Sequence, residues 1–262
     1  MSRKPRSLSS TGIYHIMLRG NERKPVFADD QDKRKFIKII DIKRCELNFS
    51  LYAYCLMDNH VHLLIDTKEH HISVIMRGVA TRYATYYNWK HDRVGHVFQD
   101  RYKSEPVENE RYLLAVVRYI HNNPVQAGLA NTPEDYEWSS YLAYLSNSAH
   151  VPYINRHVVL RLFSDKEESA ITQFMAFSMK AKDEDGFNFI EDDGQMIKTL
   201  AEGRILLDRY LAEKGLLANN FQRDVRDDLI RYLSGRTSLS QSTIAQLIGI
   251  NRKTVMRVLQ EK

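Results

Sequence analysis

SLYAYCLMDNHVHLLID, residues 50–66, predicts two β-strands joined by a tight turn. Its first half is rich in aromatic and apolar residues, Asp58-Asn59 is a two-residue turn signal, and the second half returns as a strand. Side chains alternate along a strand, so His60 and His62 project from one face of the return strand and Val61 from the other. The stretch therefore predicts a β-hairpin that carries two histidines side by side next to its turn.

The segments on either side of this hairpin extend it to an α+β domain. Asp29 or Asp30 can cap a helix that includes Leu47, and Pro124 is expected to end a later helix that begins at Asn109. The order β-α-β-β-α-β-α predicts a ferredoxin-like antiparallel sheet with helices packed on one face. The remaining predicted elements are strands over 12–20 and 97–107 and helices over 71–89 and 109–122.

The composition is that of a globular chain with room for a sizeable core. Its 262 residues are 43% hydrophobic, and the formal net charge of +5 permits a polyanionic partner without requiring one. The two cysteines, Cys45 and Cys55, form neither a disulfide framework nor a CxxC metal motif. Because the sequence shows no signal peptide and no apolar run long enough to span a membrane, we expect a cytoplasmic protein without membrane contact.

The histidine pair, His60 and His62, can bind a metal ion. Residues two apart on a strand lie about 6.6 Å apart at their Cα atoms. Two imidazoles at that spacing can converge on one ion with bonds of about 2.1 Å. Such an ion would act as a Lewis acid on a phosphate oxygen. The alternative is a pair of partly exposed hairpin histidines, which an isolated HxH motif more often represents.

The helical segment NERYLLAVVRYIHNNPV, from Asn109, carries a candidate nucleophile. Tyr119 and Asn123 are four residues apart and therefore lie one above the other on the helix surface. A tyrosine phenol can attack a phosphodiester to form a covalent intermediate, and the Asn123 amide oxygen suits Mg²⁺ or Mn²⁺ as a third ligand. Tyr112 shares the face at i+7 and is the rival nucleophile. Alternatively, Tyr119 packs at a helix–sheet boundary and Asn123 caps the helix.

Five ordered motifs resemble the single-tyrosine HUH transposases, and among these the REP-associated (IS200-like) tyrosine transposases. The motifs are YHI and RGN within 14–21, MDNHVHLL at 57–64, FQDRYKS at 98–104, YIHNNPV at 119–125 and WSSY at 138–141. The resemblance covers roughly residues 8–145. Many relatives carry proline where this chain has Asp58, and whether Asp58 or His15 takes part in the site is left open.

The resemblance implies a fold, a metal and a reaction. The fold would be the ferredoxin-like HUH nuclease core, with His60 and His62 as ligands of Mg²⁺ or Mn²⁺ and Asn123 in the position of a third ligand. Tyr119 would be the nucleophile, forming a 5′-phosphotyrosine link and releasing a 3′-hydroxyl. The substrate would be single-stranded DNA that carries a REP-like hairpin.

Basic side chains near the predicted strands can contact DNA. Arg19 lies by the first strand, and Arg101 and Lys103 by the fourth, where each could bind a phosphate. Each is explained equally well as a solvated surface charge.

The C-terminal segment predicts a helix-turn-helix. Ala245 and Gly249 occupy the small-residue and turn positions, and residues 221–262 hold eight basic and four acidic residues. The outward side of the second helix would meet duplex DNA. The side chains placed there are Arg252, Lys253, Thr254 and Arg257. The alternative is a plain helical hairpin that docks on the catalytic domain.

These patterns divide the chain into three parts. We expect a catalytic domain over 1–145, an acidic, partly helical connector over 146–195, and a helix-turn-helix DNA-binding domain over 196–262. The connector prediction depends on residues 165–194, which hold nine acidic and three basic residues. The sequence leaves open whether the protein is a monomer or a homodimer.

Three functions fit the sequence. The first is a metal-dependent DNA strand transferase, which the intact histidine pair and tyrosine favour. The second is a DNA-binding regulator or architectural protein that keeps the fold without the chemistry. The third is an RNA-binding protein on a ferredoxin-like sheet, which requires exposed aromatic side chains such as Tyr52 and Tyr54.

Overall fold

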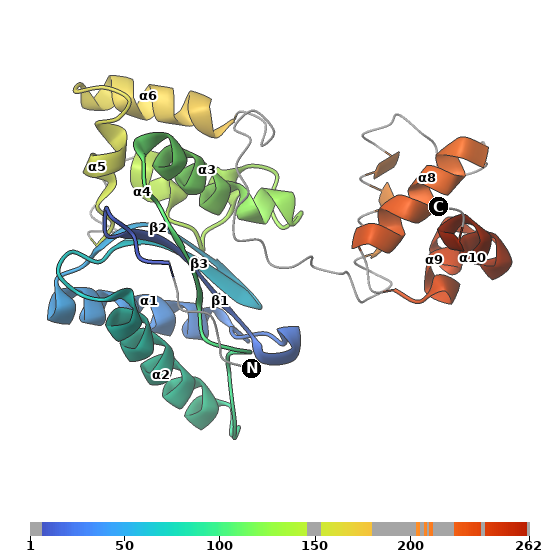
Figure 1. Ribbon diagram of the computed structural model, residues 1–262, viewed down its shortest axis with the longest axis horizontal. Coiled ribbons are helices and arrows are strands. Elements are labelled where there is room, and N and C mark those ends of the chain that lie inside the picture. The colour runs from blue at the N-terminus through green and yellow to red at the C-terminus, as the bar shows by residue number, and fades with distance from the viewer. Residues whose placement is uncertain are drawn as a thin grey trace. The chain divides into compact units, whose positions relative to one another are not determined.

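The chain forms two compact units, Met1–Ile190 and Glu191–Lys262, which are described separately. The computed structural model is shown in Figure 1. It describes residues 7–145, 153–179, 203–204, 207–208, 210–211, 223–236 and 239–260. The acidic runs at 183–186 and 191–194 of the predicted connector lie outside the described residues.

The first unit is built on a four-stranded antiparallel sheet in the order β2-β3-β1-β4. The strands are β1 (Ile13–Arg19), β2 (Ser50–Met57), β3 (His60–Asp66) and β4 (Lys103–Pro106). This connectivity is that of the predicted ferredoxin-like α+β sheet. β4 is shorter than the predicted strand over 97–107, because the residues before Lys103 join the sheet only at the isolated bridge between Gly20 and Phe98.

Helices cover both faces of this sheet. Figure 1 shows α1 (Asp30–Leu47) and α2 (Ile72–Lys90) on one face and α3 (Glu110–Gln126) on the other. The prediction that the helices pack on one face is therefore correct for α1 and α2 and wrong for α3. The physical reason is the burial of β3, whose residues are buried along its whole length, so that both of its faces need a covering layer.

Side-chain caps begin α1 and α3, and the cap of α1 is Asp29, one of the two residues that the sequence predicts for it. Asp29 accepts a hydrogen bond from the backbone N–H of Asp32, and Asn109 does the same for Tyr112. The predicted end of α3 before Pro124 is wrong, because the helix continues to Gln126. Pro124 lies in the last turn of α3. Its missing N–H costs the helix one backbone hydrogen bond, and the residues after it remain helical to Gln126.

A loop and two short helices cover the outer edge of β2. Leu56 donates its backbone N–H to Trp138, and Ser140 donates to Tyr54, at 2.9 and 3.0 Å. An exposed strand edge would leave these backbone groups free to pair with another chain. The WSSY motif therefore closes the sheet, and this edge is followed by α4 (Tyr141–Leu145) and α5 (Arg156–Leu160).

The described part of the predicted connector packs on the first unit. α6 (Glu167–Ser178) buries Phe174, which stacks on Tyr144 with ring centroids 4.6 Å apart. Val159 of α5 is also buried in the same core. Residues 156–178 thus extend the hydrophobic core that the sheet begins.

The second unit contains α8 (Arg223–Arg236), α9 (Gln241–Ile248) and α10 (Arg252–Gln260). Gly249 ends α9 with φ of 73°, a left-handed conformation that favours glycine, and Ile250 donates its N–H back to Ala245 at 2.9 Å. Val255 on α10 is buried in the core of this unit. None of the helices described in either unit is long and apolar enough to cross a membrane.

Candidate active site

The turn between β2 and β3 is held by backbone hydrogen bonds. Val26 and Phe27 both donate their N–H groups to the carbonyl of Asp58, at 2.8 and 3.1 Å, and Gly20 donates to Asn59 at 2.8 Å. The Asp58 carboxylate lies 2.9 Å from Lys33 Nζ on α1. Asp58 therefore neutralises a lysine on the helix that covers the other face of the sheet.

Beyond this turn, the two histidines of β3 lie side by side and are almost completely buried. His60 is 2% exposed and His62 0%, and their ring centroids are 5.1 Å apart. Burial, followed by the neighbouring His60 and His15, holds the pKa of His62 well below its usual range. His62 is thus neutral at physiological pH, which is the form in which imidazole binds metals.

α3 closes over the histidine pair with Tyr119 and Asn123. The Asn123 amide lies 3.3 Å from His60 Nε2 through its oxygen and 3.5 Å from His62 Nε2 through its nitrogen. One helical turn earlier, the Tyr119 ring packs edge-on against His62 with centroids 5.4 Å apart. The structure thus brings together the predicted ligands and the predicted nucleophile, which come from one strand and one helix.

The geometry of these three side chains fits a divalent cation. Two donors that bind one ion at about 2.1 Å lie about 3.0–3.4 Å from each other, and the Asn123 oxygen lies 3.3 Å from His60 Nε2. His60 Nδ1 donates to Asn59 Oδ1 at 2.6 Å, so His60 Nε2 presents its lone pair to the Asn123 oxygen. Two facing lone pairs are favourable when a cation lies between them.

Histidine, cysteine and carboxylate side chains alone do not make a metal site here. Within the described ranges, no three or more of them are grouped so that they could hold an ion. The candidate set at His60 and His62 instead needs the amide of Asn123 as its third member. Water would complete the coordination shell of Mg²⁺, which usually keeps several waters in proteins.

His15 on β1 also belongs to this cluster. Its Nε2 lies 3.0 Å from His62 Nδ1, and its ring meets the Tyr119 ring edge-on with centroids 5.7 Å apart. Burial lowers the pKa of His15 to about 3. The sequence does indicate the face on which His15 lies, because Tyr14 and Ile16 on the apolar face of the strand place His15 on the opposite face. The partner of His15 depends on how β1 pairs with β3, which the sequence does not give.

Tyr112, the rival nucleophile, is in a different environment. Burial, followed by a hydrogen bond with Glu105, raises the pKa of Tyr112 well above its usual range. Its hydroxyl is therefore harder to ionise than that of an exposed tyrosine. The contacts with the histidine pair belong to Tyr119.

Two of the predicted DNA-binding residues lie on strands next to the histidines. Arg19 pairs directly with His60 across β1 and β3, and Lys103 pairs with Met17 across β1 and β4. Directly paired residues share a face of the sheet, so Arg19 and Lys103 face the same side as the histidines. Arg101 is exposed just before β4.

The other predicted DNA-binding residues lie on α10 of the second unit. Arg252, Lys253 and Arg257 are exposed, whereas Thr254 is half-buried. The aromatic residues required by the RNA-binding hypothesis are not exposed. Tyr52 and Tyr54 are 2% and 4% exposed, and the Tyr52 hydroxyl is bound to Asp66, so that hypothesis loses its support.

The comparisons with known proteins agree with the predicted family. Residues 9–123 match the family model of IS200-like transposases. The chain is similar to a solved structure described as a REP-associated tyrosine transposase bound to a REP hairpin, with 16% identity, a TM-score of 0.49, and coverage of 56% of this chain and 87% of that one. It is also similar to a Deinococcus radiodurans R1 protein described as a transposase, with 20% identity, a TM-score of 0.34, and coverage of 46% and 97%. No curated protein matched the sequence.

The matched segment contains every member of the cluster between β1, β3 and α3. His15, His60 and His62 fall within it, as do Tyr119 and Asn123. Over residues 9–123, which include this whole cluster, the chain is therefore similar to the IS200-like transposases.

Proposed function

We propose that this transposase-like protein nicks single-stranded DNA and rejoins it through a covalent phosphotyrosine at Tyr119. The observation that carries the proposal is the closure of Tyr119 and Asn123, one helical turn apart on α3, over the buried pair His60 and His62. A packing role alone does not explain why three buried polar side chains and the half-buried Asn123 meet here, since each buried polar group needs a partner.

In the proposed reaction, the Tyr119 hydroxyl oxygen attacks the scissile phosphorus. A bond from Tyr119 to phosphorus forms, the bond from phosphorus to the 3′ oxygen breaks, and the phenol proton replaces the lost bond on that oxygen. The products are a 5′-phosphotyrosine and a free 3′-hydroxyl, and the covalent link conserves the bond energy for rejoining. Attack by a 3′-hydroxyl on the same phosphorus reverses the step and completes strand transfer.

His60, His62 and Asn123 would hold the metal ion, and Mg²⁺ and Mn²⁺ suit this set of imidazole and amide ligands. When bound, the ion would polarise the scissile phosphate. The chain's own residues orient these ligands, because Asn59 fixes the ring of His60 through a hydrogen bond of 2.6 Å. Arg19, which pairs with His60 across the strands, is placed to contact a phosphate of the bound strand.

The proposal assigns three parts of the chain to three tasks. Residues 1–145 would carry the chemistry, and residues 146–195 would connect them to a helix-turn-helix domain in residues 196–262. In that last domain, Gly249 makes the turn between α9 and α10, and Arg252, Lys253 and Arg257 are exposed at the surface of α10. These positions suit contacts with duplex DNA, while a single-stranded, REP-like hairpin would bind the first unit.

One observation favours a second candidate function, a DNA-binding regulator without chemistry. Tyr119 is 5% exposed, so little of its side chain is open to a scissile phosphate in this structure. A protein that only binds DNA would leave Tyr119 in this buried position. The two candidates therefore differ in whether a covalent adduct forms.

The test is incubation of the full chain with a labelled, single-stranded hairpin oligonucleotide and Mn²⁺. We expect a protein–DNA adduct on a denaturing gel with the wild type and with Tyr112→Phe, which retains the nucleophile. Tyr119→Phe and His60→Ala should form none while still binding the hairpin. An adduct of unchanged yield with Tyr119→Phe would refute the nucleophile, and adduct-free binding by the wild type over a range of hairpins would favour the regulator.

A further inference from the structure

His15 lies in the middle of the sheet and directly contacts one of the proposed ligands. It is 0% exposed, and its Nε2 lies 3.0 Å from Nδ1 of His62. The two rings are stacked, with centroids 5.2 Å apart and planes inclined by 29°. The contact joins β1 to β3 through side chains, in a layer that water does not reach.

The position of the shared proton follows from the other partner of His62. The Asn123 side-chain nitrogen can only donate, and it lies 3.5 Å from His62 Nε2. His62 Nε2 therefore accepts, so that a neutral His62 carries its proton on Nδ1. The hydrogen bond between the two rings then runs from His62 Nδ1 to His15 Nε2.

The other nitrogen of His15 shows that packing alone does not explain a histidine here. His15 Nδ1 is buried and has no hydrogen-bond partner among the described residues. A buried polar atom without a partner lowers stability, and an aliphatic side chain at the same place would avoid that penalty. The acceptor that His15 offers to His62 is a function that an aliphatic side chain lacks.

We propose that His15 is a positioning residue that holds His62 in its Nδ1-protonated form and so keeps the Nε2 lone pair directed at the cation. The inference rests on the proposed metal role of His62. A hydrogen bond of this kind to the second nitrogen of a ligating histidine fixes its ring and its tautomer. His15 is not itself a ligand, because its Nε2 already accepts from His62.

Two substitutions separate positioning from packing. His15→Leu removes the acceptor and replaces it with an apolar side chain of similar size. His15→Gln can instead present an acceptor oxygen to His62. We expect His15→Leu to weaken Mn²⁺ binding, measured by electron paramagnetic resonance titration, by about 10–100-fold. His15→Gln should recover most of that loss, and circular dichroism should show that both variants are folded.

The tautomer is measured directly in the metal-free wild type by long-range ¹H–¹⁵N NMR of the histidine rings. We expect His62 to be protonated on Nδ1. A proton on Nε2, or wild-type Mn²⁺ affinity in folded His15→Leu, would overturn the proposal. Unchanged Mn²⁺ binding by His62→Ala would instead overturn the proposed metal role, and this control distinguishes that failure from a failure of His15 alone.

Discussion

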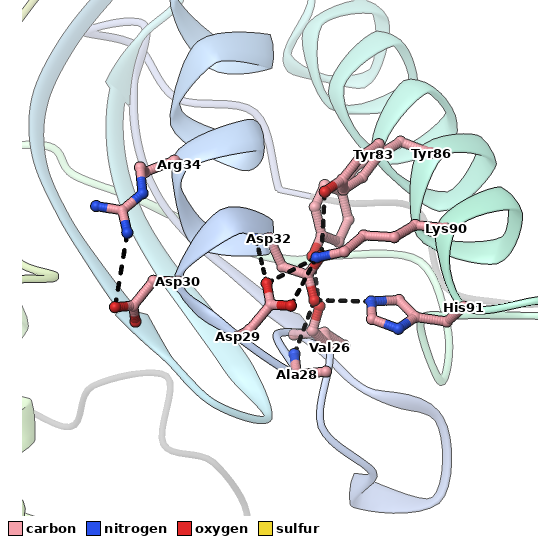
Figure 2. Close-up of polar contacts among 10 residues, drawn as sticks. All are labelled: Val26, Ala28, Asp29, Asp30, Asp32, Arg34, Tyr83, Tyr86, Lys90 and His91. Carbon is pink, nitrogen blue, oxygen red and sulfur yellow. Dashed lines mark hydrogen bonds and ion pairs between the residues drawn. The ribbon is translucent and has the colours of Figure 1, made fainter.

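Replacing Asp32 with alanine tests whether one buried carboxylate joins the start of α1 to the end of α2. Figure 2 shows Asp32 among its partners. The carboxylate is 0% exposed and lies 2.8 Å from Lys90 Nζ and 2.9 Å from His91 Nε2. It also accepts the backbone N–H of Ala28 at 2.9 Å. We refer to these contacts of Asp32 as the α1–α2 clamp.

The size of the effect follows from what Asp32→Ala leaves behind. Lys90, 17% exposed, would lose its buried counter-ion, and Ala28 would lose the acceptor for its N–H. Breaking a buried ion pair by removing one partner costs about 3–5 kcal/mol. Lys90 keeps its ion pair with Asp29, at 2.7 Å. We therefore expect Asp32→Ala to lower the free energy of unfolding by about 3 kcal/mol, the lower end of that range.

Urea unfolding followed by tryptophan fluorescence measures this loss in the first unit, because both tryptophans, Trp89 and Trp138, belong to it. The matched control is Asp30→Ala, two residues away. Asp30 forms an exposed pair with Arg34 at 3.7 Å, also visible in Figure 2, and such pairs contribute about 0–1 kcal/mol. Equal unfolding midpoints for Asp32→Ala and Asp30→Ala would refute the α1–α2 clamp.

The lowered pKa of the Asp32 carboxylate makes the stability of the first unit depend on pH. Burial acts to raise the pKa of Asp32, but the hydrogen bonds from Lys90, Ala28 and His91 outweigh it, so the pKa lies below the usual carboxyl range. Because the pKa is lowered by folding, Asp32 stabilises the protein fully at pH values above its pKa in the unfolded chain, about 3.9. This stabilisation is lost as the pH falls through the lower pKa of Asp32 in the folded protein. The urea midpoints of wild type and Asp32→Ala should therefore converge in acid.

Three further predictions concern the site and the second unit. Asn123→Ala should weaken Mn²⁺ binding at least about tenfold in an electron paramagnetic resonance titration, whereas the neighbouring Asn122→Ala, which loses bonds to backbone carbonyls, should not. Arg257→Ala should weaken duplex DNA binding in an anisotropy titration and reduce the slope of log affinity against log salt by about one. Arg231→Ala, which removes an exposed arginine of α8, should leave the affinity and the slope unchanged. Gly249→Ala should destabilise the second unit by about 1–2 kcal/mol in a thermal melt followed by circular dichroism, because φ is 73° there; an unchanged melt would argue against a strained turn.

The strands of the hairpin and the start of α1 were predictable because local chemistry determines them. Asp58-Asn59 marks the turn, so the limits of β2 and β3 follow from it, and Asp29, one of the two predicted caps, begins α1. The extent of α3 was not predictable in the same way. α3 packs against β2 and β3 and buries Pro124, and such tertiary packing can override the local preference of proline.

The roles of Asp58 and His15 required the pairing of elements far apart in the sequence. Asp58 follows β2 close to His60, and the sequence left open whether its carboxylate takes part in the site. Its partner is Lys33 on α1, at 2.9 Å. His15 is 47 residues from His62, and their contact exists only because β1 pairs with β3 in one particular register, which a single sequence does not specify.

The buried histidines themselves suggest a last test of function against stability. Single replacement of His62 by leucine leaves His15 Nε2 and the Asn123 amide without their partner, and a buried polar group without a partner costs about 1–3 kcal/mol. Replacing His15 and His62 together by leucine removes both partners of one hydrogen bond, a change that is often nearly neutral or stabilising. We therefore expect the double variant to be at least as stable in urea as His62→Leu, while Mn²⁺ binding is lost in both. If the double variant were the less stable of the two by more than about 1 kcal/mol, the histidines would be holding the fold together, and their burial would no longer argue for chemistry at this face.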